Sequence, residues 1–345
     1  MKAVFLVIDY VPHQVLSIKN LIDKANAQVL AFHVGRFNRD TPTNLSNFHT
    51  YLSQDFTKYE ILKKIEDFSP DIVVSAGWMI PEYNWVCKQL KKSSNIPIVA
   101  MSDTPWYGTW KQKINALISP FHVKKAFTHL WVAGIRQYDY ARKLGFSNEQ
   151  IIFNSLCGDT ETFNKVQLDP KKESYPKNFI YIGRFEKIKG LHNLIKAWGS
   201  IKDKKGWTFT LIGAGTMKEE LQKSGGFIVK DYMTQDKLVA ELQNAGCFVL
   251  PSLHEHWALV IHEAAIAGLP IVCTETCGAA PHFVINDYNG YRIENNDVND
   301  LQQKLTQIIN VTDNQLCLMS ENSRKISHSI CPEYQLANLL QLINE

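Results

Sequence analysis

The sequence predicts an α/β fold of two doubly wound domains, each a parallel sheet covered by helices, facing each other across a cleft. Short apolar runs alternate with amphipathic segments along the whole chain, which is typical of buried parallel strands connected by helices. A polar stretch with two prolines, residues 166–177, interrupts this alternation, which then restarts. The length of 345 residues fits two domains, since a domain has about 100 to 200 residues.

The expected elements follow the apolar and amphipathic segments. Strands of the first domain are predicted at residues 2–8, 28–33, 71–75, 97–101, 129–133 and 150–153, with helices at 56–67 and 82–92. In the second domain we predict strands at 178–182, 207–212, 226–229, 246–250 and 270–273, and helices at 190–202, 216–224, 235–244, 260–267 and 299–310. The predicted domain limits are 1–165 and 178–330, with a linker at 166–177 and a helix at 331–345 that packs back on the first domain.

The charge of the chain is small but uneven. The net charge of +3 is too low to predict nucleic-acid binding. Residues 1–170 hold 19 Lys and Arg against 15 Asp and Glu, whereas residues 171–345 hold 18 against 19. A positive first half favours an acidic partner, such as an anionic membrane surface or a phosphorylated acceptor.

Cysteine and hydropathy patterns predict the compartment. Seven scattered cysteines indicate a reducing, cytoplasmic environment. Neither the cysteines nor His254, His256 and His262 have the spacing of a zinc site, so we expect no metal. The first apolar run is too short for a signal peptide, and no run approaches the roughly 18 apolar residues of a membrane span.

The first candidate site follows the strand predicted at 178–182. Gly183 permits a tight turn, and Arg184 and Lys189 lie on the loop after it. Arginine can bind a pyrophosphate through two parallel hydrogen bonds and lysine can bind it as a point charge, so both are candidates for a diphosphate ligand. A solvated basic loop is the alternative.

A second glycine turn follows the strand predicted at 207–212. Gly213 and Gly215 let the backbone approach a ligand, and the N-terminus of the next helix favours an anion. The turn lacks the third glycine and the later acidic residue of a dinucleotide fingerprint, which argues against NAD. By itself this turn identifies no ligand.

The segment 251–270 is the most informative. Its polar turn carries Glu255, and a helix begins near Leu259. Glu263 lies in the early turns of that helix, where a carboxylate can accept hydrogen bonds from both hydroxyls of a ribose. The free amides of Leu259 and Val260 can bind a phosphate with assistance from the helix dipole. The alternative for the two glutamates is helix capping and dipole complementarity.

Together these segments resemble the second domain of the family 4 (group 1) glycosyltransferases of GT-B fold, which have two Rossmann-like domains. The resemblance covers most of 178–310 and extends more weakly into 145–163, while residues 1–130 match in architecture only. It rests on the order of the motifs, namely the loop 181–190, the Gly213-Ala214-Gly215 turn, the region of Asp231-Tyr232-Met233, the run 251–264, and Gly278-Ala279-Ala280-Pro281 followed by Asn289-Gly290.

The resemblance implies a nucleotide-sugar donor and a role for each candidate. Arg184 and Lys189 would clamp the diphosphate, and Glu255 would meet the donor sugar. The remaining donor-site positions are Glu263 for the ribose, Tyr232 and Met233 for the base, and Gly183, Gly213, Gly215, Leu259 and Val260 around them. The implied mechanism is retaining transfer without a metal or cofactor, in which the diphosphate leaves on the face that the acceptor enters.

Some positions depart from the family pattern. Asp103 stands where the family often has a histidine, after the strand predicted at 97–101. A carboxylate there can position a sugar hydroxyl or accept a proton, so Asp103 remains a catalytic candidate. His282 replaces the glutamate of a Gly-Gly-x-Pro-Glu pattern, and the loop at 11–14 lacks paired glycines.

The basic and aromatic stretch 105–127 leaves two interpretations open. Aromatic and lysine side chains can lie at a bilayer headgroup boundary, and acceptors in the family are often lipid-linked. Alternatively, the stretch is a helix whose Ile114, Leu117 and Ile118 pack on the sheet while its lysines face water.

The function implied is transfer of a sugar from a UDP- or GDP-sugar to a carbohydrate or lipid-linked acceptor in cell-surface polysaccharide or glycolipid synthesis. The N-terminal domain would bind the acceptor. The expected location is cytoplasmic, with peripheral contact to the inner face of the membrane through 105–127. Two alternatives stay open: a non-catalytic nucleotide-sugar-binding subunit, and another GT-B enzyme such as a sugar-nucleotide epimerase.

Overall fold

The computed structural model describes residues 1–35 and 45–344, which form two compact units. The first unit contains Met1–Cys157 and Pro332–Glu345, and the second contains Gly158–Cys331. The boundary therefore precedes the stretch 166–177 that we predicted as a linker. That stretch instead contains helix α8 (Asp169–Glu173) with a buried Lys171, and it belongs to the second unit.

The first unit is built on a seven-stranded parallel sheet in the order β3-β2-β1-β4-β5-β6-β7. Its strands are β1 (Lys2–Val7), β2 (Gln28–His33), β3 (Phe48–Leu52), β4 (Ile72–Ser75), β5 (Ile98–Ser102), β6 (His129–Val132) and β7 (Ile151–Ile152). The inner strands are buried on both faces because helices cover both faces of a parallel sheet. Six of the seven match the predicted strands, and β3 was missed.

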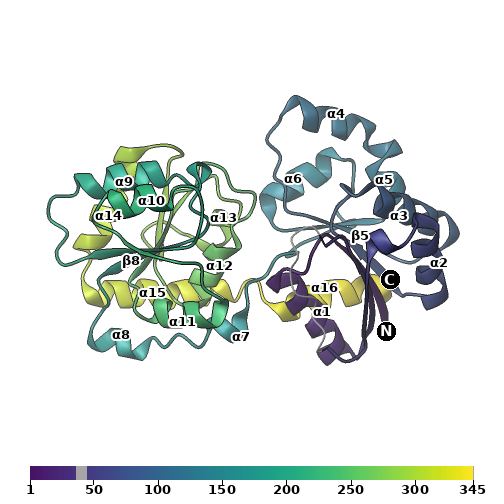
Figure 1. The fold of residues 1–345 in the computed structure, drawn as a ribbon, viewed down its shortest axis with the longest axis horizontal. Helices are drawn as coiled ribbons and strands as arrows, with labels where there is room; N and C mark the ends of the chain where they lie inside the picture. Colours follow the sequence, from purple (N-terminus) through teal and green to yellow (C-terminus); the bar gives the residue numbers. More distant parts are fainter. Residues whose placement is uncertain (36–44, 345) are drawn as a thin grey trace. The chain divides into compact units, whose positions relative to one another are not determined.

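The helices of the first unit include one from the far end of the sequence. They are α1 (Pro12–Ala25), α2 (Lys58–Phe68), α3 (Pro81–Ser93), α4 (Trp110–Ile118), α5 (Val123–Ala126), α6 (Ile135–Lys143) and α16 (Pro332–Asn344), with short 3-10 turns η1 (Ser53–Asp55) and η2 (Ser119–Phe121). Helix α16 packs beside α1 (Figure 1), where the Ser17 hydroxyl donates to Gln335 Oε1 at 3.1 Å and Leu339 enters the core. Residues 332–344 thereby complete one face of the first sheet.

The second unit repeats this architecture with six parallel strands in the order β10-β9-β8-β11-β12-β13. The strands are β8 (Asn178–Ile182), β9 (Thr208–Ile212), β10 (Ile228–Lys230), β11 (Cys247–Leu250), β12 (Ile271–Thr274) and β13 (Gly290–Ile293). Numbered along the unit, this order is 3-2-1-4-5-6, which is that of a doubly wound, Rossmann-like sheet. The predicted fold class is therefore confirmed, although β13 was not predicted.

Helices cover both faces of the second sheet as well (Figure 1). Besides α8 they are α7 (Thr160–Phe163), α9 (Leu191–Ser200), α10 (Lys218–Lys223), α11 (Gln235–Gln243), α12 (Leu259–Ile266), α13 (Ala280–Phe283), α14 (Val298–Asn310) and α15 (Asp313–Ser327), with the 3-10 turn η3 (Lys187–Lys189). Local sequence sets several starts: the Asp297 carboxylate caps α14, and a capping box of Thr312 and Gln315 begins α15. No helix in the described residues is long and apolar enough to cross a membrane.

The strand order predicts where each sheet binds its ligand. In doubly wound sheets, ligands bind outside the carboxyl ends of the strands, at the point where the chain reverses its direction across the sheet. This point lies between β1 and β4 in the first unit and between β8 and β11 in the second. In the second unit, the loops that leave β8 and β11 are those that carry the sequence motifs.

Candidate functional site

The loops after β8 and β11 are joined by a salt bridge. The Leu253 amide donates to the Ile188 carbonyl at 2.9 Å, and beside this contact the Lys189 ammonium is paired with the Glu255 carboxylate. The two side chains are only 13% and 19% exposed. The structure thus brings together the predicted phosphate cation and the predicted sugar-binding carboxylate.

Gly190 makes this close approach of the two loops possible. Its φ is +70°, which L side chains rarely adopt, and a Cβ placed there would lie 1.9 Å from the Pro251 carbonyl oxygen. Gly190 therefore sets the geometry of the Lys189–Glu255 pair. The sequence places this glycine at the end of the loop motif 181–190, but nothing in the motif predicted its role.

The second glycine turn packs against the first loop. A Cβ on Gly213 would lie 1.9 Å from the Gly183 carbonyl oxygen, and the Phe185 amide donates to the Ala214 carbonyl at 2.8 Å. The structure thus shows this turn packed closely against the neighbouring loop. Gly215 lines a separate groove with Thr216.

Five of the predicted donor residues line one cavity of about 250 Å³ in the second unit. They are Gly183, Arg184, Gly213, Tyr232 and Met233, and the other lining residues are Ile182, Ile212, Ala214 and Leu238. The walls are mainly apolar, and the exposed Tyr232 adds an aromatic ring. Apolar walls beside the exposed cation of Arg184 suit a base that carries phosphate.

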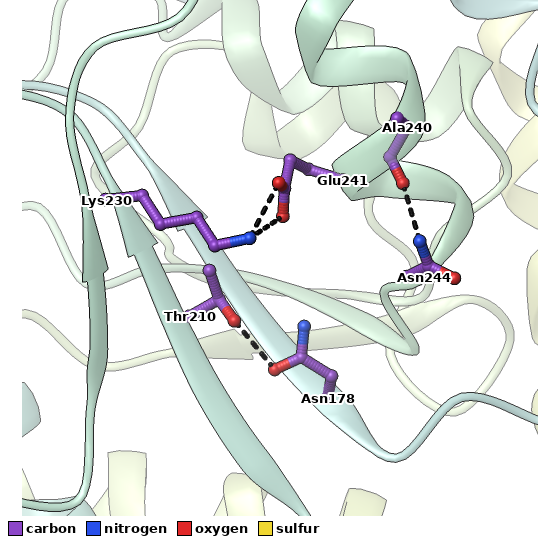
Figure 2. A network of polar contacts seen from close by, with 6 residues as sticks. All are labelled: Asn178, Thr210, Lys230, Ala240, Glu241 and Asn244. Atoms are coloured by element: carbon purple, nitrogen blue, oxygen red, sulfur yellow. Dashed lines mark hydrogen bonds and ion pairs between the residues drawn. The ribbon is translucent and has the colours of Figure 1, made fainter.

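The segment that carries Tyr232 and Met233 follows Lys230, whose ion pair with Glu241 is drawn in Figure 2. This segment lies between β10 and α11. At one end, the Lys230 ammonium bonds both carboxylate oxygens of Glu241 on α11, at 2.7 and 2.8 Å. The pair holds the end of β10 against α11, so the short connection between them is anchored on both sides.

Helix α12 begins with unpaired amides. Ala258, which precedes it, has a left-handed φ of +72°, a conformation that costs a non-glycine residue energy and is common at functional sites. Among the described residues, no acceptor is found for the amides of Leu259 and Val260. These two N–H groups at the positive end of the helix dipole can bind an anion.

Glu263 lies one turn further along α12 and is half-buried. Gln235 Nε2, at the start of α11, donates to its Oε1 at 3.1 Å. Burial raises the pKa of Glu263 to about 7, and the bond from Gln235 partly offsets that effect. A carboxylate that is incompletely solvated gains most from additional hydrogen-bond donors, such as the hydroxyls of a ribose.

His262, by contrast, serves the packing of the second unit. It is buried, its Nδ1 accepts from the Gly158 amide at 3.0 Å and its Nε2 contacts the Ser327 carbonyl at 3.1 Å. Burial lowers its pKa to about 4, so the ring is neutral at pH 7. No group of three or more His, Cys, Asp or Glu side chains in the described parts of the chain could hold a metal ion.

Asp103 belongs to the first unit, whereas the candidates described above belong to the second. It is exposed at the carboxyl end of β5 and lines a cavity of about 770 Å³ with residues of α3 and α4. This cavity also lies against the loop after β4, Ala76 to Met79. The first unit thus has its own pocket at the carboxyl edge of its sheet.

The packed-helix interpretation of the stretch 105–127 is wrong. Ile114, Leu117 and Ile118 of α4 are 49%, 77% and 43% exposed. The buried residue of α4 is Gln112, whose amide donates to the Pro105 carbonyl at 2.7 Å and accepts from the Tyr107 amide at 2.8 Å. These two bonds hold Gln112 against the preceding loop, while the apolar side chains of α4 face outward.

Comparison with known proteins finds relatives of the second unit. Residues 162–326, just under half of the chain, match the family described as "Glycosyl transferases group 1". Glycogen synthase of Mycobacterium tuberculosis is 31% identical over 144 residues, which are 39% of this chain and 34% of that protein. The capsular polysaccharide biosynthesis glycosyltransferase CapM of Staphylococcus aureus is 30% identical over 168 residues, 43% of each protein. The chain thus matches well under two thirds of these relatives' lengths.

The likeness in fold extends over the whole chain. The crystal structure of Anabaena HepE in complex with UDP superposes with a TM-score of 0.74 at 13% sequence identity, and the match covers 100% of this chain and 98% of that one. At this identity the match establishes the fold alone, and it is the predicted GT-B fold of two Rossmann-like units.

Proposed function

We propose that the whole chain transfers a sugar from a nucleotide-sugar donor to an acceptor, because residues 162–326 match the group 1 glycosyl transferases. The observation that carries the proposal is the convergence of Lys189, Glu255 and the free amides of α12 on the loops after β8 and β11. A UDP-sugar is the favoured donor, because a structure of the same fold contains UDP.

In the proposed mechanism the base occupies the cavity beside Met233, and the ribose hydroxyls donate to Glu263. Arg184, Lys189 and the first amides of α12 bind the diphosphate. As the anomeric C–O bond breaks, negative charge grows on the departing phosphate, and these fixed donors stabilise it. The acceptor enters on the same face, so the configuration is retained, and no metal takes part.

Glu255 has a second task in this proposal. Its ion pair holds Lys189 in place before the diphosphate arrives. When the phosphate shares Lys189, the Glu255 carboxylate becomes available to accept hydrogen bonds from hydroxyls of the donor sugar. The acceptor, a carbohydrate, is bound by the first unit, where Asp103 lines the large cavity and can position an acceptor hydroxyl.

We also propose that the protein contacts the cytoplasmic face of a membrane through α4 and η2. Six exposed apolar side chains occur between residues 107 and 121, namely Tyr107, Trp110, Ile114, Leu117, Ile118 and Phe121. Residues 104–138 contain five Lys and Arg and no Asp or Glu. Apolar side chains that can insert between lipids, together with cations that attract anionic headgroups, are the two requirements for peripheral binding.

A donor assay tests the proposed function. Release of the nucleoside diphosphate, UDP or GDP, is measured with UDP-glucose, UDP-galactose, UDP-N-acetylglucosamine and GDP-mannose, with and without acceptor sugars, on native protein and on Glu255→Ala. We expect turnover with one donor class that the variant lacks, while nucleotide binding persists in both. Nucleotide binding without turnover of any donor would favour a non-catalytic binding subunit, and inversion at C2 of the donor sugar would favour an epimerase.

A further inference from the structure

The cavity of the first unit has charges that its neighbours do not neutralise. Two lysines line it, Lys88 from α3 and Lys111 from α4, against the single carboxylate of Asp103. In the parts of the chain that the structure describes, neither lysine has an ion-pair partner within 4.0 Å. A cavity with uncompensated lysines attracts an anionic ligand.

Helices α3 and α4 both contribute polar side chains to this cavity. On α3, Asn84 and Lys88 are four residues apart and so lie on one face of the helix, and on α4 Lys111 and Asn115 have the same spacing. All four residues line the cavity. Its polar groups therefore come from two helices that are separate in sequence.

A histidine and a buried amide lie beside these lysines. His122 Nδ1 and Asn84 Nδ2 are 3.3 Å apart, and both residues line the cavity. Burial lowers the pKa of His122, and the positive charge of Lys88 lowers it further. Asn84 is only 7% exposed, and its Oδ1 has no hydrogen-bond partner among the described residues. Donors and acceptors thus coexist next to the lysines, which suits a ligand with both phosphate and hydroxyl groups.

Aromatic rings also line this cavity. Trp78, Trp85 and Tyr140 line the cavity, and Tyr140 contacts the ring of Trp78 at 6.3 Å and accepts from Asn115 Nδ2 at 2.7 Å. The apolar face of a sugar ring packs well on aromatic rings of this kind, while its hydroxyls bond to amides.

We propose that this cavity binds the phosphate-bearing end of the acceptor, a sugar linked to phosphate or pyrophosphate. Lys88 and Lys111 bind the phosphate, and the tryptophans and amides bind the sugar ring. This inference rests on the proposed function and specifies the chemical class of its acceptor. The phosphate can belong to a soluble sugar phosphate or to a lipid-linked one, and the shared chemistry is the sugar phosphate.

The test is a binding titration of the full chain with glucose 1-phosphate and with glucose. Tryptophan fluorescence and calorimetry measure the two affinities. We expect glucose 1-phosphate to bind at least about tenfold more tightly, since a hydrogen bond to a charged group contributes about 1.5 to 3 kcal/mol. Lys88→Gln and Lys111→Gln should each remove most of this preference. Lys92→Gln on α3 and Lys113→Gln on α4 are matched controls, because both residues are exposed and neither lines the cavity.

Equal affinity for the two sugars, no binding of either, or equal effects of the cavity and control variants would overturn the inference. A further arm compares glucose 1-phosphate with a short-chain isoprenyl phosphoglucose in phosphatidylcholine vesicles. Tighter binding of the latter supports a lipid-linked acceptor, and equal binding supports a soluble one. UDP binding is measured on the same samples. If the native protein does not bind UDP, the proposed donor site is wrong. If it binds UDP but not the sugar phosphate, only the present inference is wrong.

Discussion

Lys189 and Glu255 are 66 residues apart in the sequence, yet their side chains form a largely buried ion pair at the point where the second sheet reverses direction. A buried pair of this kind costs desolvation energy, and it is often retained for a specific purpose rather than for stability. Here it holds a cation beside the free amides of α12. The pair is therefore the natural first target for mutation.

Arg184→Ala and Lys189→Ala should each lower kcat about 100- to 1000-fold, which corresponds to about 2.7 to 4 kcal/mol for the loss of one fixed donor to a developing anion. The measurement is UDP release from the preferred donor at saturation. Lys187→Ala is the control, because this exposed lysine lies on the same turn outside the ion pair. If Lys187→Ala proves as damaging as Lys189→Ala, the diphosphate role of Lys189 is wrong.

Gly190→Ala should destabilise the second unit by at least about 2 kcal/mol, because a left-handed alanine alone costs roughly 1 to 2 kcal/mol and its Cβ would overlap the Pro251 carbonyl. Urea unfolding measures the change. Gly199→Ala on α9 is the matched control, since a Cβ placed there would meet no atom within 4 Å. That variant should gain about 0.5 to 1 kcal/mol from helix propensity. Similar stability of the two variants would show that the approach of the loops does not require glycine.

Glu263 should make nucleotide-sugar binding depend on pH. Its pKa is raised by burial from 4.5 to about 7, whereas ribose hydroxyls donate best to the charged form. The affinity for UDP-glucose should therefore rise about tenfold as the pH increases from about 6 to about 8, because the carboxylate ionises over this range. Glu263→Gln should bind more weakly at pH 8 and with little pH dependence, as measured by calorimetry.

The same shift gives a stability control. Because the folded state holds the Glu263 proton more tightly than the unfolded state, this group lowers the free energy of unfolding as the pH rises from 4.5 to about 7. In Glu263→Gln this loss is absent. The midpoint temperature of native protein relative to the variant should fall over that interval, and a constant difference would contradict the raised pKa.

Lys171 should affect stability in the alkaline range. Burial, and then the charge of Arg324, lower its pKa from 10.5 to about 7, and its ammonium donates to the Ala245 carbonyl at 2.9 Å. The unfolded chain binds the proton more tightly, so stability should rise between pH 7 and pH 10.5, by up to about 1.4 kcal/mol per pH unit. Thermal unfolding measures the change. The native protein and the control Lys172→Met, at an exposed position, should gain stability over this pH range, whereas Lys171→Met should not.

Leu117→Glu and Phe121→Glu should each weaken binding to phosphatidylglycerol vesicles at least tenfold, because burying one such side chain is worth about 1.5 to 3 kcal/mol. Both residues are 77% exposed, so the substitutions should leave the fold intact. Leu318→Glu on α15 is the control, at a position 53% exposed in the second unit. Vesicle flotation measures the binding. Equal flotation of all three variants would contradict the proposed membrane contact.

Strand positions could be predicted well where the middle of the strand is buried. The strands β2 and β8 have the predicted bounds, 28–33 and 178–182. Strand β3 was missed because it lies at the sheet edge, where Phe48 and Tyr51 are half-buried and His49 is exposed. Strand β13 was missed because it begins with Gly290, whose Cβ would lie 1.9 Å from the Ile271 carbonyl oxygen. An edge position and a close backbone contact are not visible in the hydropathy pattern of the sequence.

The site could be predicted as a set of loops but not as a set of contacts. Glycine and charge at Gly183 to Lys189 indicated the first loop, yet nothing local indicated that Lys189 pairs with Glu255. The orientation of α4 was equally hidden, because an apolar stripe usually faces the core. It depends on Gln112, whose bonds to the backbone around Pro105 and Tyr107 turn the stripe outward.

The return of α16 to the first unit has a consequence for biosynthesis. The second unit is one continuous segment, whereas the first needs residues 332–344 to cover its sheet beside α1. The second unit can therefore fold without residues 332–344, whereas the first keeps an uncovered apolar face until those residues have been synthesised. A chain that ends before residue 332 would retain the complete second unit linked to a first unit whose exposed apolar face favours aggregation.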